Sequence, residues 1–519
     1  MIRSFITVST GTLASRLLGF ARDAMIAALL GTGPVADAFL AAFQLVNVAR
    51  RLLSEGALNA ALVPSWLRLR ETEGTSAAAA FAGRVLGSIS AALVVVTVLI
   101  GLAMPLVMSV LAPGFAVSAT LALAVKDARL MLPYLAFAGP ATVLLALASA
   151  QGRFALTAFS PLLFNVALIA AMVVLIIARQ ETGLAATWLA ATTGVAGLLQ
   201  LTILVLRRRG GDLATPLRVS FDAEMRGFFV HALPAMVANS GPQLLAVAGA
   251  IIASASPSAV SWLYFANRLV ELPLGIVGVA MGTVLVPELT RALRGGEAGA
   301  VAQAESRGLE LAVGLALPAM LGLIVLADPI ATLLFEHGAF TAADAAATAQ
   351  MLSFLALGLP AHVLVKALSP AFFAREDTMA PLVATAKGAI VAIVAAVLLG
   401  HYFGASGIAA GIALGSWSHA ASLIRRGTAT FGFSIDAAAR RRLPRIVGAA
   451  LMMGALLWLG TWLVPDRAGA HGLAQAAALA ILMTGGIGSY GLFLWLLGVT
   501  GWREAVNAIG RPARGDLRA

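Results

Sequence analysis

Seven charged side chains are spread over two adjacent apolar stretches near the start of the chain, within residues 12–66. They are Arg16, Arg22, Asp23, Asp37, Arg50, Arg51 and Glu55. Both stretches are long and apolar enough to cross a bilayer as helices. An ionised side chain at bilayer depth costs about 2.5–3.5 kcal/mol even on insertion scales, so it normally faces a bundle interior or a water-filled cavity. The pattern therefore predicts one wall of a polar chamber inside a membrane protein.

A polar stripe is predicted along the second stretch. Asp37, Gln44 and Arg51 are each seven residues apart, so they stack on one helix face with a drift of about 20° per heptad. Glu55 follows Arg51 by four residues and joins the same face. The second half of the chain adds an Arg and a Glu of its own, at positions 268 and 271.

Arginines outnumber carboxylates in these segments. The arginines are Arg16, Arg22, Arg50, Arg51 and Arg268, and the carboxylates are Asp23, Asp37, Glu55 and Glu271. Because the guanidinium is a planar fork that stays charged and matches phosphate geometry, the excess favours a chamber that binds an anionic group such as phosphate or pyrophosphate. The alternative is that Asp23, Glu55 and Glu271, each within one turn of an arginine, form neutralised ion pairs that only fix helix register.

The composition is that of a polytopic membrane protein. The chain has 519 residues, of which 60% are hydrophobic and 11% charged, and its mean hydropathy is +0.94. It has no cysteine, which excludes disulfides, thiolate metal sites and cysteine nucleophiles. The net charge of +11 comes from basic residues in alternate loops, which is an orientation signal of membrane proteins rather than a sign of nucleic-acid binding.

Fourteen apolar spans are predicted, so we expect an all-α fold. They lie near residues 8–30, 36–63, 84–111, 130–150, 158–178, 184–206, 228–252, 260–287, 309–335, 345–373, 380–401, 405–424, 446–464 and 473–499. Of the 35 Lys and Arg residues, 24 fall in one set of connecting and terminal segments and 4 in the opposite set. This bias predicts that both termini are cytoplasmic. No cleavable signal peptide is expected.

An internal repeat divides the chain. Residues 132–161 align with residues 352–381, and the identities include Leu132 with Leu352, Pro140 with Pro360 and Pro161 with Pro381. Six helices per repeat give both halves the same topology, an arrangement typical of transporters with a site between the repeats. We therefore predict two six-helix lobes, residues 1–210 and 211–430, followed by two further helices and a cytoplasmic tail in residues 431–519.

Several long motifs resemble the MurJ (MviN) family of lipid II flippases. They are Ser15–Asp23 (SRLLGFARD), Ala36–Ala57, Asn267–Leu289, Leu333–Asp344 and Ala356–Thr378. The resemblance covers the first twelve predicted helices in order. It implies the fold of the multidrug/oligosaccharidyl-lipid/polysaccharide exporter superfamily, with two lobes and a C-terminal helix pair that would hold the lipid tail of the substrate.

The resemblance also implies roles for particular side chains. Arg16, Arg22, Arg50 and Arg268 match cavity arginines that the family requires, and Asp37 and Glu55 match required carboxylates. Arg22, Asp23 and Arg268 match an anion-contacting cluster.

Two departures from the family stand out. The predicted seventh helix has Gly249 where some members have an acidic sodium ligand, and the eleventh has no Asp or Asn, so a hard cation would lack oxygen ligands there. Gln44 to Asn47 stand where the family commonly has a Lys and a Pro.

Together these observations favour a non-enzymatic, monomeric flippase of a bacterial cytoplasmic (inner) membrane. It would move lipid II, an undecaprenyl-pyrophosphate-linked peptidoglycan precursor, between leaflets by alternating access. No cofactor is expected beyond a bound anion such as chloride or coupling to the membrane potential. A flippase for another polyprenyl-linked glycan would use the same arginines. Three other classes are disfavoured. A multidrug exporter of cations would need an acidic cavity, whereas arginines are in excess here, and a glycosyltransferase would need a large extramembrane loop. A scaffold would not need buried arginines.

Overall fold

The computed structural model is built of α-helices, and the part of the chain it describes contains no β-strand. The structure describes residues 2–54, 57–116, 118–206, 214, 217–220, 222–223, 225–230, 241–281, 285, 288–289, 291–292, 298–373, 375, 377, 379–433, 435–463 and 472–499. The expected all-α fold is confirmed.

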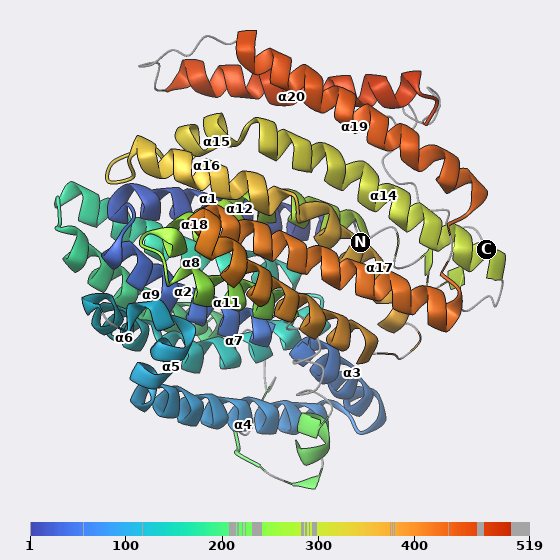
Figure 1. The fold of residues 1–519 in the computed structure, drawn as a ribbon. Coiled ribbons are helices and arrows are strands. Elements are labelled where there is room, and N and C mark those ends of the chain that lie inside the picture. Colours follow the sequence, from blue (N-terminus) through green and yellow to red (C-terminus); the bar gives the residue numbers. More distant parts are fainter. Residues whose placement is uncertain are drawn as a thin grey trace. The chain divides into compact units, whose positions relative to one another are not determined.

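Figure 1 shows the helices in their order along the chain. In the first half they are α1 Ile2–Leu30, α2 Pro34–Ser54, α3 Ala57–Thr72, α4 Thr75–Leu102, α5 Met104–Leu111, α6 Ala119–Met131, α7 Pro133–Ala150, α8 Phe154–Ile177, α9 Thr182–Leu206 and α11 Gly241–Ala253, with a 3-10 turn η1 at Pro113–Phe115. In the second half they are α12 Ala259–Ala280, α14 Ala298–Val325, α15 Ala327–Phe335, α16 Ala342–Ala356, α17 Leu359–Phe373, α18 Met379–Phe431, α19 Ala437–Leu463 and α20 Leu473–Leu496.

Eight helices of the described segments are long and apolar enough to cross a membrane, or up to nine if the bent pair α16 and α17 is one span. The number fourteen stays a prediction. The helices α1 and α2 are not among the eight. They carry the charges from which the polar chamber was predicted, and these charges lower the mean hydropathy on which such a test rests.

Several predicted spans are broken or extended. The span predicted for 84–111 is divided between α4 and α5, where Pro105 stands in the first turn of α5. Pro133 likewise opens α7 directly after α6. Proline suits a first turn because the N–H that it lacks has no helical partner there. The spans predicted for 380–401 and 405–424 lie on the single long α18, which has a kink at Gly404, where φ is 59°.

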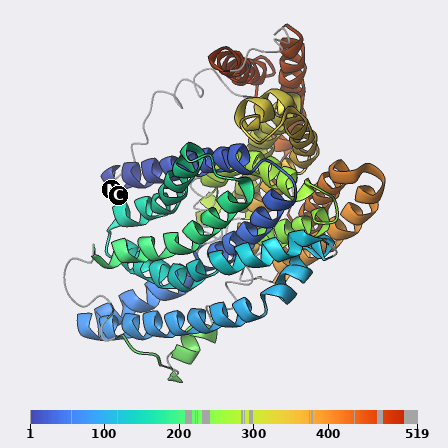
Figure 2. The ribbon, with the colours of Figure 1, turned by 90° about the vertical axis from the view of Figure 1, so that its left-hand side faces the viewer.

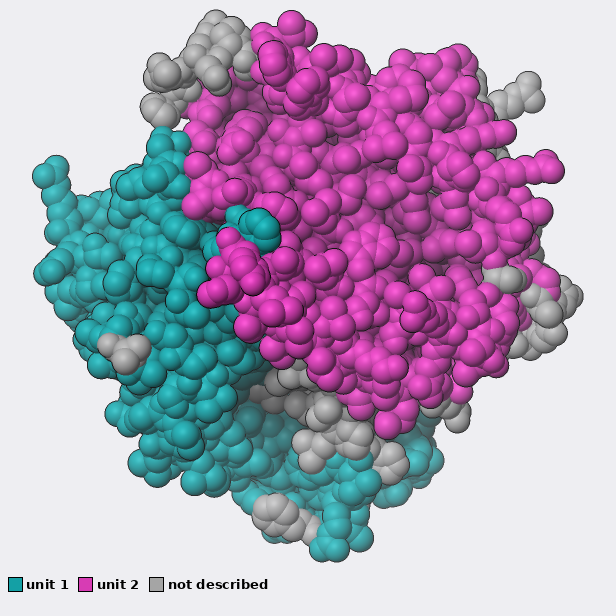
Figure 3. Space-filling model, in the orientation of Figure 1, with its two compact units in different colours: residues 1–265, 334–345, 403–408 teal, residues 266–333, 346–402, 409–519 magenta. Residues whose placement is uncertain are grey.

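Contacts divide the chain into two compact units (Figure 3). Unit 1 comprises residues 1–265, 334–345 and 403–408, and unit 2 comprises residues 266–333, 346–402 and 409–519. These units are defined by packing, whereas the lobes ending at residues 210 and 430 were inferred from a sequence repeat. The lobe boundaries therefore stay a prediction.

Within unit 1, α1 packs along α8, α2 packs on α6, and α9 contacts α6, α7 and α8. Small residues permit these close approaches. A Cβ at Gly194 of α9 would lie 2.4 Å from the carbonyl oxygen of Leu130, at the end of α6. Glycine is the residue that lets membrane helix backbones come this close.

A short non-helical segment, residues 217–220, lies along α4 in the same unit. The Ser88 hydroxyl donates to the Ser220 carbonyl at 3.0 Å and accepts from the Ser220 N–H at 3.0 Å. Beyond it, Asp222 accepts a hydrogen bond from the Met225 N–H at 2.8 Å. That bond, with a second one from the Ser220 hydroxyl, lowers the pKa of the exposed Asp222 carboxyl.

Within unit 2, α14 packs against α17 and α19, and α20 lies alongside α19 (Figures 1 and 2). The two arms of α18 fold back on each other through small residues. A Cβ at Gly411 would lie 2.3 Å from the amide nitrogen of Ala396. A Cβ at Gly415 would lie 2.4 Å from the Cβ of Ala392, which is one turn before Ala396. The arms therefore form a tight antiparallel hairpin.

Candidate functional site

Two buried charges of unit 1 are neighbours on α1. Arg22 is 4% exposed and Asp23 is fully buried. The Nε and Nη2 atoms of Arg22 both donate to Oδ1 of Asp23, at 2.9 and 2.6 Å. A carboxylate that receives two guanidinium N–H groups forms a strong charge-assisted contact. This pair is therefore the neutralised ion pair that the sequence left open as an alternative for Asp23.

Arg22 has further partners on α2 and α8. Its Nη1 donates to the Asn165 side-chain oxygen at 2.9 Å, and the Asn165 amide donates to the Ser15 carbonyl at 3.1 Å. Its guanidinium carbon lies 5.1 Å from the ring centre of Phe43 and 5.8 Å from that of Phe164. Contacts of this kind with aromatic faces favour a desolvated cation. The surroundings thus hold the Arg22 fork in one orientation.

Two more polar groups join this cluster. The hydroxyl of Tyr264, near the start of α12, donates to Asp23 Oδ1 at 3.1 Å. The guanidinium of Arg50 lies 5.7 Å from the centre of the same Phe164 ring that Arg22 approaches. The structure therefore brings Arg22, Asp23 and Arg50 into one neighbourhood. We call Arg22, Asp23, Arg50, Asn165 and Tyr264 the arginine cluster.

Asp37 is placed differently from the arginine cluster. It is 3% exposed, and its two oxygens accept hydrogen bonds from the backbone N–H groups of Ser258 and Ser261, both at 2.9 Å. The Ser261 hydroxyl also donates to Asp37. These N–H groups lie at the beginning of α12, where no helical partner is available to them. Asp37 thus caps α12 from a different helix.

The remaining predicted site residues are less enclosed. Arg16 on α1 is exposed, and Arg51 on α2 is half-buried. Arg268 and Glu271 form a half-buried ion pair of 2.8 Å on α12, within unit 2. Glu55 lies outside the described residues. That Arg268 and the arginine cluster face one chamber stays a prediction.

Asn165, Tyr264 and the two phenylalanines were not identified from the sequence. Asn165 carried a usable signal, because it is an amide within a strongly apolar helix, and such a group needs a hydrogen-bond partner in a membrane. Tyr264 and the phenylalanines carried none, because aromatic residues in apolar helices are common.

Known proteins resemble this chain over most of its length. The family model "Lipid II flippase MurJ" matches residues 26–472. A protein of Rhizobium tropici named "Probable lipid II flippase MurJ" is 36% identical, with 96% of this chain and 94% of the relative covered. The "Lipid II flippase MurJ" of Burkholderia cenocepacia is 31% identical over 96% of this chain and 98% of its own length.

Solved structures show the same fold. A structure titled "Lipid II flippase MurJ, inward closed conformation" matches with a TM-score of 0.79 at 20% identity, over 96% of this chain and all of that one. An inward-facing multidrug resistance MATE family transporter of the MOP superfamily matches with a TM-score of 0.65 at 16% identity, over 85% of this chain and 98% of its own.

The described helices define a polytopic α-helical membrane protein with the fold of these solved transporters. Within that class the match is specific, because the family model spans most of the chain and close-to-full-length relatives share about a third of its residues. The chain belongs to the MurJ family of lipid II flippases.

Proposed function

We propose that this chain moves lipid II, the undecaprenyl-pyrophosphate-linked peptidoglycan precursor, from the inner to the outer leaflet of a bacterial cytoplasmic membrane. Its family is one of lipid flippases, and its fold is shared with MATE transporters captured facing inward and outward. The observation that supports an anionic lipid-linked substrate is the buried Arg22, whose fork is held in place by Asp23, Asn165 and two aromatic rings.

In this proposal Arg16, Arg22 and Arg268 contact the pyrophosphate. Arg22 donates two of its five N–H groups to Asp23 in this structure, and in this proposal the pyrophosphate replaces Asp23 as their acceptor. An exchange between two anionic acceptors keeps the guanidinium hydrogen-bonded throughout, which avoids the cost of an unpaired buried charge. Arg50, Asp37 and Glu55 would hold the sugar–peptide end or gate the cavity.

Further parts of the proposal rest on the sequence. The chain acts as a monomer in the bilayer with both termini in the cytoplasm, performs no covalent chemistry, and uses no cofactor other than a bound anion such as chloride or the membrane potential. A flippase for another polyprenyl-linked glycan is the alternative, which family membership disfavours.

The test is depletion of the protein in its own host, followed by an assay of which leaflet holds the lipid-linked precursor. Rescue is attempted with Arg22→Ala and, as a matched control, Arg68→Ala, because Arg68 is exposed on α3. We expect the precursor to stay in the inner leaflet when Arg22→Ala is present in the membrane, and to be exported with Arg68→Ala. Normal precursor export during depletion, with loss of another surface glycan, would overturn the substrate assignment.

A further inference from the structure

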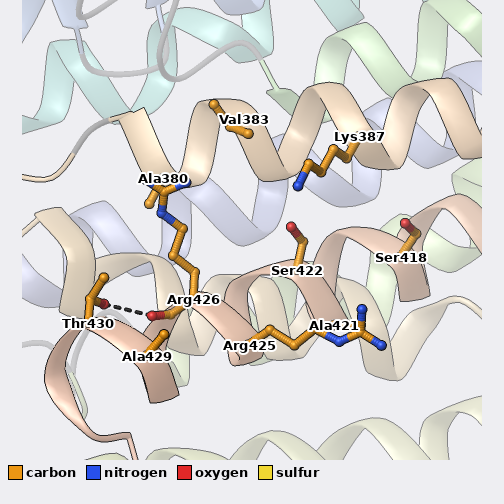
Figure 4. A pocket seen from close by; sticks show the side chains of 10 residues that line it. All are labelled: Ala380, Val383, Lys387, Ser418, Ala421, Ser422, Arg425, Arg426, Ala429 and Thr430. Carbon is orange, nitrogen blue, oxygen red and sulfur yellow. Dashed lines mark hydrogen bonds between the residues drawn. The ribbon is translucent and has the colours of Figure 1, made fainter.

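A groove of about 620 Å³ lies between the two arms of α18, within unit 2 (Figure 4). It is well removed in sequence from the arginine cluster, which lies on α1, α2, α8 and the first turns of α12. Its lining consists of Ala380, Val383, Lys387, Ser418, Ala421, Ser422, Arg425, Arg426, Ala429 and Thr430. None of these residues takes part in the proposed transport of lipid II.

The charge of the groove is entirely positive. Lys387 comes from one arm and Arg425 and Arg426 from the other, and no carboxylate belongs to the lining. Among the ion pairs of the described residues, none involves these three cations. The nearest acidic residue in the sequence, Asp377, accepts a hydrogen bond from the Ala380 N–H at 2.9 Å and so caps the start of α18.

Hydroxyl groups accompany the cations. Figure 4 shows Ser418 and Ser422 on the arm opposite Lys387, with the Lys387 ammonium directed across the groove toward Ser422. The hydroxyl of Thr430 is already engaged, because it donates to the Arg426 carbonyl at 2.7 Å. Cations together with serine hydroxyl donors are the groups that bind phosphate oxygens.

An apolar track continues from the basic groove along the hairpin. Val391 and Val394 follow Lys387 on the same helix face, and Leu414 precedes Ser418 by one turn on the other arm. These three side chains are 37%, 53% and 49% exposed. A charged pocket that passes into an exposed apolar surface matches a molecule with a phosphate at one end and a hydrocarbon chain at the other.

We propose that this groove binds the phosphate group of an anionic membrane lipid, with an acyl chain along Val391, Val394 and Leu414. Free inorganic phosphate offers the same oxygens to the groove as a lipid headgroup, but the apolar track favours the lipid. Basic pockets between membrane helices on the cytoplasmic side typically bind acidic lipid headgroups, and the sequence predicts that this end of α18 is cytoplasmic.

The test uses the purified full-length protein in detergent and native mass spectrometry. Binding of phosphatidylglycerol, which is anionic, is compared with that of phosphatidylcholine, which is zwitterionic. The variants are Lys387→Gln, Arg425→Gln and Arg426→Gln, singly and together. The matched control carries Arg440→Gln, Arg441→Gln and Arg445→Gln, which remove three exposed cations from α19.

We expect the preference for phosphatidylglycerol to fall about fivefold for each groove cation removed, since a basic residue near the surface contributes about 1 kcal/mol toward an anionic lipid. The α19 control is expected to keep the preference, and Lys387→Arg is expected to restore it relative to Lys387→Gln. A triple groove variant that still prefers phosphatidylglycerol as the native chain does, or an equal loss in the α19 control, would overturn the proposal.

A second experiment distinguishes a lipid phosphate from free inorganic phosphate. Val394→Gln is expected to weaken lipid binding, and millimolar inorganic phosphate is expected to leave the bound lipid in place. If inorganic phosphate displaces the lipid and Val394→Gln has no effect, the groove binds free phosphate and the lipid assignment is wrong. Neither result bears on lipid II export, because the groove variants leave the arginine cluster unchanged.

Discussion

Two buried carboxylates of unit 1 have different partners, and this difference separates their roles. Asp23 accepts two N–H groups from Arg22, whereas Asp37 accepts from backbone N–H groups of Ser258 and Ser261. The sequence placed both on the wall of one chamber. It could not distinguish them, because the partners of Asp37 lie more than 200 residues away and are two serines among many.

Replacing Asp37 tests its capping role. Asp37→Asn keeps one acceptor oxygen but turns the other into a donor that faces an N–H group, so we expect a loss of about 1–3 kcal/mol in the free energy of unfolding. Asp37→Ala leaves all the N–H groups without this acceptor, and a larger loss is expected. The measurement is thermal unfolding in detergent, with export of the precursor assayed in parallel. Unchanged stability of Asp37→Asn together with abolished export would instead indicate that the carboxylate contacts the substrate.

Arg22→Lys tests whether the fork or only the charge matters. A lysine ammonium cannot bind Asp23 through two N–H groups, reach Asn165 and face two rings at once. We therefore expect Arg22→Lys to fail in rescuing depleted cells although the protein is present in the membrane. Arg68→Lys on the exposed side of α3 is the control and should rescue. Full rescue by Arg22→Lys would show that a point charge suffices.

At the scale of elements, hydrogen bonds in unit 1 join the end of α1 and the turn after it to the loop before α16 and to its first turn. The Ala339 N–H donates to the Ala28 carbonyl at 2.8 Å, and the Thr32 hydroxyl donates to Asp344 at 2.6 Å. Gly338 has φ of 59°, and a Cβ there would lie 2.3 Å from the Ala28 oxygen. Only glycine combines this conformation with this approach. The loop is therefore shaped to lie on α1.

We expect alternating access to require that the contact between Thr32 and Asp344 breaks during the transport cycle. The chain has no cysteine, so Thr32→Cys combined with Asp344→Cys gives a single pair that can be crosslinked. We expect oxidation of the double variant to stop export and a reductant to restore it, because the lobes can then rock again. The two single variants, treated with the same oxidant, serve as controls. Undiminished export by the crosslinked protein would contradict an alternating-access role for this contact.

The helices themselves could be predicted well, but their breaks could not. Apolar runs located α4, α7, α8, α9, α19 and α20, because length and composition alone decide whether a helix can cross a bilayer. The division of α14 from α15 was missed although Pro329 stands in the first turn of α15, because a proline inside an apolar run can either kink a helix or end it. Segments expected to be loops proved helical where basic residues continue a helix, as on α3 and in the first turns of α19.

At the scale of the whole molecule, the sequence repeat and the contacts describe different divisions. The repeat predicts two lobes of equal topology, whereas unit 1 takes in residues 334–345 of the second half. The Asp344 contact with Thr32 and the Tyr264 contact with Asp23 explain this, because they join segments of the second repeat to α1 or to the turn that follows it. No local pattern predicts contacts at separations of 312 and 241 residues.

The charge balance of the predicted chamber leads to an expectation about its energy source. The five arginines and four carboxylates named in the sequence leave the empty chamber net positive, and a bound pyrophosphate makes it net negative. With the cell interior negative, the potential then favours outward movement of the loaded state and inward return of the empty state. Each elementary charge that crosses 100 mV is worth about 2.3 kcal/mol, which is about fiftyfold in the populations of two states.

We therefore expect that collapsing the potential slows export of the precursor in proteoliposomes, and that reversing it slows export further. Replacing chloride with a large organic anion at constant potential is the matched control, because a chloride-coupled cycle would respond to that change and not to the potential. Arg50→Gln removes one positive charge, which makes the loaded chamber more negative and the empty chamber neutral, so it should strengthen the potential dependence of the outward step and remove that of the return step. An export rate that is the same at every potential would eliminate charge movement as the driving force and leave the anion gradient as the remaining candidate.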